Sequence, residues 1–256
     1  MIEVVTSGGI SRLTLDRPES RNALNGEVMA LLGERLDAIE ADDSVRIVIV
    51  TGAGEVFSAG ADLNAMKRAQ AVGEDENRRD AAAMGALFHR LAAFPRPVIA
   101  RVNGPAIGGG VGLMAACDVV VADERAFFAF SEVRLGLVPA VISPFCVGRL
   151  GASRARRLFL TGERFDAASA LHWGLVDEVA ASGKLDEFVE RLCGRLLKGG
   201  PLALAEAKRL IERVANSPAS EVLDYTSDLI ARLRVSREAL EGMAAFLEKR
   251  SPQWSP

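Results

Sequence analysis

The sequence is poor in cysteine, with only three among 256 residues, and this scarcity narrows the chemistry open to it. Cys117, Cys146 and Cys193 show none of the paired C-x-x-C spacing that is typical of zinc and disulfide-exchange sites. We therefore interpret the three side chains as buried thiols, since free cysteine behaves as a small apolar residue. The cysteines therefore predict neither a zinc site nor a disulfide-exchange site.

Histidine is scarcer still, with two residues in the chain. His89 and His172 fall in segments with a helical pattern, and we interpret both as structural. Ser58 and Ser131 have no histidine and aspartate arranged for nucleophilic catalysis, so a serine-nucleophile triad is not expected.

The chain also lacks an excess of charge of either sign. Its 31 Lys and Arg residues stand against 34 Asp and Glu residues, and the charges are interspersed. Such a distribution predicts neither nucleic-acid nor acidic-membrane binding. No apolar run approaches 18 residues, and residues 1–6 lack the features of a secretion signal. We therefore expect a cytoplasmic protein whose partners are small molecules or copies of itself.

Apolar periodicity predicts an α/β fold. Residues 2–5 and 12–16 indicate a hairpin, residues 26–41 an amphipathic helix, and residues 66–90 a charged and then helical segment. Further apolar strands are expected at residues 46–51, 98–102 and 118–121. Helix formers then dominate, at residues 152–160, 167–173, 185–197, 201–215, 220–233 and 236–249. We predict a core over residues 1–197 and a helical oligomerisation region over residues 198–256.

Two glycine- and alanine-rich turns carry the strongest functional signal. They lie at Phe57-Ser-Ala-Gly-Ala-Asp-Leu63 and at Ala106-Ile-Gly-Gly-Gly110, the second between a predicted strand and a helix-compatible segment. Gly109 is thus expected at a helix N-terminus, where free N–H groups favour negative charge. Glycine clusters also serve tight turns, so the pattern alone leaves a structural role open. A dinucleotide-binding fingerprint is disfavoured because Leu113 stands where its last glycine belongs.

The order and spacing of these motifs resemble the enoyl-CoA hydratase/isomerase family, the crotonase-like proteins, along essentially the whole chain. The resemblance rests on the two turns above and on segments at residues 16–25, 103–110, 117–118, 130–139, 160–166, 174–179 and 242–250. It implies a spiral of ββα units with a helical C-terminal region. It also implies acyl-CoA thioester substrates, no metal or redox cofactor, and assembly as a homotrimer or dimer of trimers.

Carried over by position, the resemblance makes the backbone N–H groups of Ala61 and Gly109 the oxyanion donors, with Glu132 as the acid/base. Hydratases of this family usually have a second glutamate, but Gly112 occupies that position here. Two carboxylates can divide the activation of water and the delivery of a proton, and a single carboxylate must do both. A glutamate at position 112 is expected to meet the substrate.

The single carboxylate leaves several functions open. Hydration of an enoyl-CoA is favoured, because residues 108–113 combined with residues 131–144 look similar to bacterial methylglutaconyl-CoA and related branched enoyl-CoA hydratases. Double-bond isomerisation and noncatalytic acyl-CoA binding remain alternatives. Arg134 would share the face of Glu132 in an extended segment and could meet a glutaconyl-type carboxylate, although a surface or intersubunit ion pair is favoured. Residues 66–90 and 138–146 are expected to shape the acyl pocket.

Coenzyme A is expected along two segments that the resemblance assigns to it. These are the loop at Arg21 and the backbone of Ala59, Gly60, Ala61, Asp62 and Leu63. Asp62 and Asp118 are expected to hold turns through backbone hydrogen bonds. Phe246 and Lys249 match C-terminal positions that approach the nucleotide, often from a neighbouring subunit. A helix with one apolar and one solvated face is the alternative explanation for those two residues.

Overall fold

The computed structural model describes residues 1–255, except the side chain of Leu63. Its main sheet has the strand order β1-β2-β3-β4-β6-β9. Within this main sheet, β1 and β2 pair antiparallel, and all other neighbouring strands pair parallel. The strands are β1 (Ile2–Ser7), β2 (Ile10–Leu15), β3 (Ile47–Gly52), β4 (Val98–Val102), β6 (Val119–Asp123) and β9 (Glu178–Ala180). A small second sheet joins β5 (Ala106–Ile107), β7 (Phe127–Ala129) and β8 (Arg164–Asp166).

Ten α-helices and two short 3-10 helices lie among the described residues. The 3-10 helices are η1 (Pro18–Ser20) and η2 (Ser131–Leu135). Six α-helices precede β9 in the sequence: α1 (Gly26–Ala41), α2 (Leu63–Ala71), α3 (Glu74–Ala92), α4 (Gly109–Ala115), α5 (Ser143–Thr161) and α6 (Ala167–His172). They are followed by α7 (Leu185–Leu196), α8 (Pro201–Ala215), α9 (Ala219–Arg234) and α10 (Arg237–Leu247).

The sheet separates two apolar clusters because both of its faces are covered, as parallel strands require. On one face the strands pack with α1, α3, α4 and α5 in the larger cluster. On the other face, Leu185, Val189 and Cys193 of α7 pack on Ile49 and Val121. The predicted α/β class is therefore confirmed, and all three cysteines are buried free thiols as expected.

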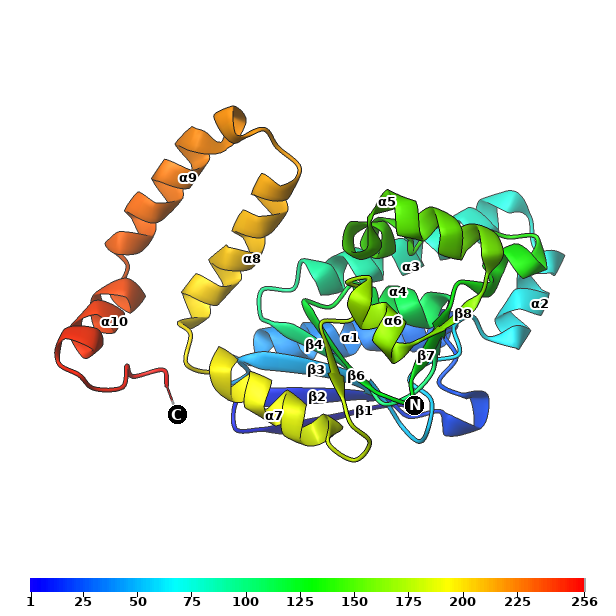
Figure 1. The fold of residues 1–256 in the computed structure, drawn as a ribbon, viewed down its shortest axis with the longest axis horizontal. Helices are drawn as coiled ribbons and strands as arrows, with labels where there is room; N and C mark the ends of the chain where they lie inside the picture. The colour runs from blue at the N-terminus through cyan, green and yellow to red at the C-terminus, as the bar shows by residue number, and fades with distance from the viewer. Residues whose placement is uncertain (256) are drawn as a thin grey trace.

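The last three helices extend away from this core. In Figure 1, α8, α9 and α10 lie at one end of the molecule, and α2 lies at the opposite end. Large apolar side chains remain exposed along them: Leu202, Ile211, Leu223, Ile230, Val235, Leu240, Met243, Phe246 and Leu247. A partly buried ion pair ties α8 to the core, where Nζ of Lys208 donates to Oδ2 of Asp118 over 2.7 Å and to the Arg96 carbonyl over 3.1 Å.

Several predicted boundaries needed correction. The segment at residues 66–90 forms two helices, α2 and α3, which are separated at Val72 and Gly73. Helix α5 begins at Ser143, well before residue 152, and contains a non-helical residue at Gly151. Residues 131–135 form η2 and are not extended, so the argument that placed Arg134 on the face of Glu132 was wrong. No helix of the described residues is long and apolar enough to cross a membrane.

Candidate active site

The two small-residue turns lie against each other at the start of α4. Gly60 has a φ of 84°, and a Cβ built on it would lie 2.5 Å from the carbonyl oxygen of Ile107 and 3.3 Å from the Gly109 nitrogen. Only a residue without a side chain fits this close approach. Gly60 therefore lets the backbone before Ala61 pass directly beside the first residue of α4.

The neighbouring backbone groups are used in hydrogen bonds. The carbonyl of Gly60 accepts from Leu24, and the N–H of Gly108 donates to Ala129 over 2.9 Å. By contrast, the N–H groups of Ala61 and Gly109 donate to no protein acceptor within residues 1–255. Gly109 is the first residue of α4, where the helix dipole adds to the attraction for negative charge. These two amides are therefore available to a ligand oxygen.

Glu132 reaches the same place from η2, which follows β7. A Cβ built on Gly108 would lie 2.9 Å from Oε1 of Glu132, so the bare backbone of Gly108 makes room for the carboxyl group. The other carboxyl oxygen, Oε2, is buried and has no hydrogen-bond partner among the described residues. An unpaired buried polar atom costs free energy, and in native proteins it calls for a functional explanation.

Burial raises the pKa of Glu132 above its ordinary value, because the charged form loses solvation. Cys146, which lies nearby in α5, is buried as well, and the pKa of its thiol is also raised, first by burial and then by the charge of Glu132. The thiol therefore stays protonated near neutral pH. Glu132 is left as the group suited to accept and return a proton.

Glu132, Ala61 and Gly109 line one cavity of about 160 Å³. Its remaining walls are apolar: Leu24, Met84, Val138, Pro139, Ala140, Val141 and Ile142. Both segments expected to shape the acyl pocket thus contribute to it. Leu24 was not predicted as a wall of the pocket, although it lies in the segment at residues 16–25 that carries part of the resemblance. An adjoining cavity of about 510 Å³ between α1, α2 and α3 shares Leu24, Ala61 and Met84 with the first.

Gly112 does not face this cavity, which corrects the expectation that a glutamate there would meet the substrate. A Cβ built on Gly112 would overlap Cγ2 of Ile142 and would lie 2.6 Å from the Cβ of the same residue. It would also lie 3.3 Å from the ring of Phe88. The space beside Gly112 is therefore already filled by apolar side chains.

The two segments expected to bind coenzyme A run side by side. The N–H of Ala59 donates to the Arg21 carbonyl over 2.9 Å, and Leu24 forms a parallel bridge with Ala61. Asp62 caps α2 by accepting from the N–H groups of two residues of its first turn. Arg21 is exposed with a φ of 54°. The side chain of Leu63 lies outside the described part of the chain.

Other predicted residues lie elsewhere. Phe246 lies in the last turn of α10 and Lys249 follows the end of that helix, which is far from α2 within one chain (Figure 1). The Phe246 side chain is 82% exposed. Arg134 is exposed and lies beside Gly162, away from the cavity. His89 and His172 are exposed helical residues and do not line it.

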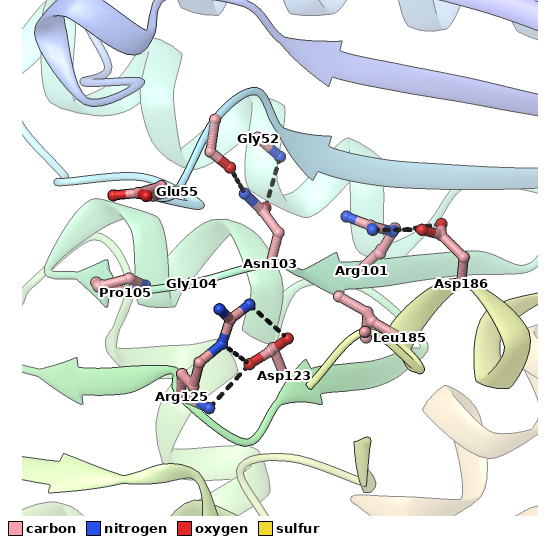
Figure 2. A pocket seen from close by; sticks show the side chains of 12 residues that line it. Gly52, Glu55, Arg101, Asn103, Gly104, Pro105, Asp123, Arg125, Leu185 and Asp186 are labelled. Atoms are coloured by element: carbon pink, nitrogen blue, oxygen red, sulfur yellow. Dashed lines mark hydrogen bonds and ion pairs between the residues drawn. The ribbon is translucent and has the colours of Figure 1, made fainter. Parts of the chain in front are cut away.

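A more polar cavity of about 600 Å³ opens at the carboxyl ends of β3, β4 and β6 (Figure 2). Arg101 pairs with Asp186 over 2.8 Å, and Arg125 pairs with Asp123 over 2.8 Å. Asn103 holds the loop after β3 through backbone hydrogen bonds. Four of the charged groups of this cavity thus pair with one another, Glu55 also lines it, and none of the predicted catalytic residues does.

Comparison with known proteins agrees with this geometry. The family model for enoyl-CoA hydratase/isomerase matches residues 5–256. The chain belongs to the enoyl-CoA hydratase/isomerase family. The structure matches an enoyl-CoA hydratase from Shewanella pealeana with a TM-score of 0.95 and 38% identity, over 99% of this chain and 95% of that one. The predicted crotonase-like fold is thus confirmed, and the protein is an enzyme of this family.

Two further relatives span the chain. The 2,3-dehydroadipyl-CoA hydratase of Escherichia coli K12 is 36% identical over 243 residues, which cover 94% of this chain and 93% of that protein. Pseudomonas aeruginosa AtuE matches with a TM-score of 0.96 and 36% identity, over 100% of this chain and 99% of that one. Among the described residues, no group of three His, Cys, Asp or Glu side chains could hold a metal ion.

Proposed function

We propose that the protein is an enoyl-CoA hydratase, which adds water across the 2,3 double bond of an enoyl-CoA thioester. The observation that carries this proposal is the unpaired carboxyl oxygen of Glu132, in one cavity with Ala61 and Gly109, whose N–H groups are free. Negative charge develops on the thioester oxygen when water attacks C3. Two preorganised N–H donors stabilise that charge, and each is typically worth about 10²- to 10³-fold in rate.

A single carboxylate suffices for the proton balance. The Glu132 carboxylate accepts a proton from water as the water oxygen bonds to C3 and the electron pair of the double bond moves toward the thioester. The resulting enolate oxygen is held by the N–H groups of Ala61 and Gly109. Protonated Glu132 then returns its proton to C2, which regenerates the carboxylate and completes the addition of one water.

The walls of the 160 Å³ cavity favour an uncharged acyl group. Among the described residues that line it, Glu132 is the only ionisable one, so a terminal carboxylate of a glutaconyl-type substrate would meet no cation from them. The volume has room for roughly five groups of about 30 Å³, the share of one water molecule in the liquid. We therefore propose a short or branched apolar acyl group as the substrate class.

We further propose that residues 198–256 form an oligomerisation region that builds a homotrimer or a dimer of trimers. The nine large apolar side chains that stay exposed along α8 to α10 support this, because burial against another subunit would remove them from water. In such an assembly, Phe246 and Lys249 would approach coenzyme A bound to a neighbouring subunit along Arg21 and residues 59–63. Light scattering tests this, and a strict monomer at micromolar concentration would overturn it. Cytoplasmic localisation remains a prediction.

The decisive experiment compares Glu132→Gln with Glu178→Gln, a matched change at an exposed carboxylate on β9. The absorbance of a conjugated enoyl-CoA is followed together with product mass. We expect a gain of one water in the wild type and in Glu178→Gln, and turnover lower by about 10²- to 10⁴-fold in Glu132→Gln.

Other outcomes decide between the alternatives. Full activity of Glu132→Gln would refute the mechanism. Unchanged mass with a shifted double bond would mean isomerisation, in which Glu132 moves a proton between two carbons. Acyl-CoA binding without turnover in the wild type would indicate a noncatalytic binder.

A further inference from the structure

Gly112 lies on the buried face of α4, where two side chains approach its bare backbone. A Cβ built at this position would overlap Ile142 and would approach Cε2 of Phe88 to 3.3 Å. Contacts this short cannot persist in a close-packed interior, so any side chain at position 112 must displace a neighbour. The question is which of the two neighbours yields.

Phe88 has no room to move. Its side chain is fully buried, and its ring packs edge to face on Phe145 with centroids 6.2 Å apart. Ile142 is different, because its side chain also lines the cavity that contains Glu132. Its backbone is fixed at the start of α5, where its carbonyl accepts from the N–H of Cys146 over 3.1 Å. A new group at position 112 therefore pushes the Ile142 side chain toward the empty space of the cavity.

We propose that Gly112 and Ile142 together set the size of the acyl group that the enzyme accepts. The missing side chain at position 112 provides the space into which Ile142 is withdrawn, and this withdrawal keeps the 160 Å³ cavity open. Ile142 is the specificity-determining residue in direct contact with the acyl group, and Gly112 is its positioning residue. This inference rests on the proposed function and adds the structural origin of its acyl-size limit.

The test compares kcat/KM for 3-methylbut-2-enoyl-CoA with kcat/KM for but-2-enoyl-CoA, two substrates that differ by one methyl group. One methyl in an apolar pocket changes selectivity by about tenfold or more. Gly112→Ala should therefore lower the branched-to-linear ratio by about tenfold, and Ile142→Ala should raise it. The double variant should return the ratio to within about twofold of the wild type, because the new methyl then has room.

Gly148→Ala is the matched control, since a Cβ on this exposed glycine of α5 would meet nothing within 4 Å. Its ratio should equal that of the wild type. An unchanged ratio in folded Gly112→Ala, or a double variant without rescue, would overturn the proposal. If Gly112→Ala does not fold, Ile142→Val provides the test. An unchanged branched-to-linear ratio of kcat/KM in that variant would also overturn the proposal.

Binding separates failure of this inference from failure of the proposed function. The dissociation constants of butanoyl-CoA and 3-methylbutanoyl-CoA report the size limit without any turnover. If the wild type binds both thioesters but hydrates neither substrate, the hydratase proposal fails. The same variants must still shift the binding ratio in the stated directions for the Gly112–Ile142 proposal to stand.

Discussion

The unpaired carboxyl group of Glu132 should cost the protein stability, and Glu132→Gln should recover part of that cost. Oε2 is buried without a partner, and a buried unsatisfied polar group costs about 1–3 kcal/mol, more when it is charged. The amide of glutamine still has to be buried but carries no charge. We therefore expect the free energy of unfolding of Glu132→Gln to exceed that of the wild type by about 1 kcal/mol at pH 7.

The sign of the pH dependence follows from the direction of the shift. Burial raises the pKa of Glu132 in the folded state above its unfolded value of about 4.3. Between these two pKa values the folded protein binds more protons than the unfolded chain, so the wild type loses stability as the pH rises. Below the unfolded pKa both states are protonated, and no charge is buried. The advantage of Glu132→Gln should thus be complete above the folded-state pKa and should vanish below about pH 4.

Urea unfolding followed by circular dichroism from pH 4 to 8 measures this difference directly. Glu178→Gln serves again as the control, because its carboxylate is exposed and should show no such pH-dependent gain. A Glu132→Gln variant that is less stable than the wild type at pH 7 would refute the reasoning. A gain in stability that stays constant across this pH range would show that its cause is not the buried charge.

Three further perturbations test other parts of the structure. Gly109→Pro should abolish turnover and keep the fold, because proline is tolerated at the first position of a helix but removes the N–H; activity in a folded variant would remove Gly109 from the oxyanion hole. Gly112→Glu should lower the melting temperature and bring no gain in hydration, because its side chain would overlap Ile142. Lys208→Met should cost about 1–3 kcal/mol by leaving Asp118 half-buried without its cation, and an unchanged thermal melt would contradict this.

The elements that the sequence predicted best are those with a local signal at their first residues. The predicted helix at residues 26–41 matches α1, where Asn25 caps the first turn by accepting from the N–H of Val28. The predicted helix at residues 201–215 matches α8, which begins at a proline suited to the first turn. Apolar periodicity and capping act over a few residues, so they can be found without knowledge of the tertiary contacts.

The site was predictable in part because its close backbone approaches require glycine, and the glycines can be seen in the sequence. Gly60 and Gly108 mark places where a Cβ would strike Ile107 and Glu132, so the glycines themselves pointed to the close approach of the two turns. The conformation of residues 131–135 was missed, since one short 3-10 helix has no periodicity to detect. Gly136, which ends that helix with a φ of 72°, is the one local sign of it.

The orientation of Gly112 could not be predicted, because it depends on Ile142, thirty positions further along the chain. A helical wheel places residue 112 about one turn after Gly109, which favours the substrate side, but the start of α5 folds over that position and fills it. The position that would hold a second carboxylate is thus closed by packing, and restoring a glutamate there cannot restore a two-carboxylate site. Introducing a second carboxylate at position 112 therefore requires a smaller residue in place of Ile142, because the Ile142 side chain occupies the space that any new group at position 112 would need.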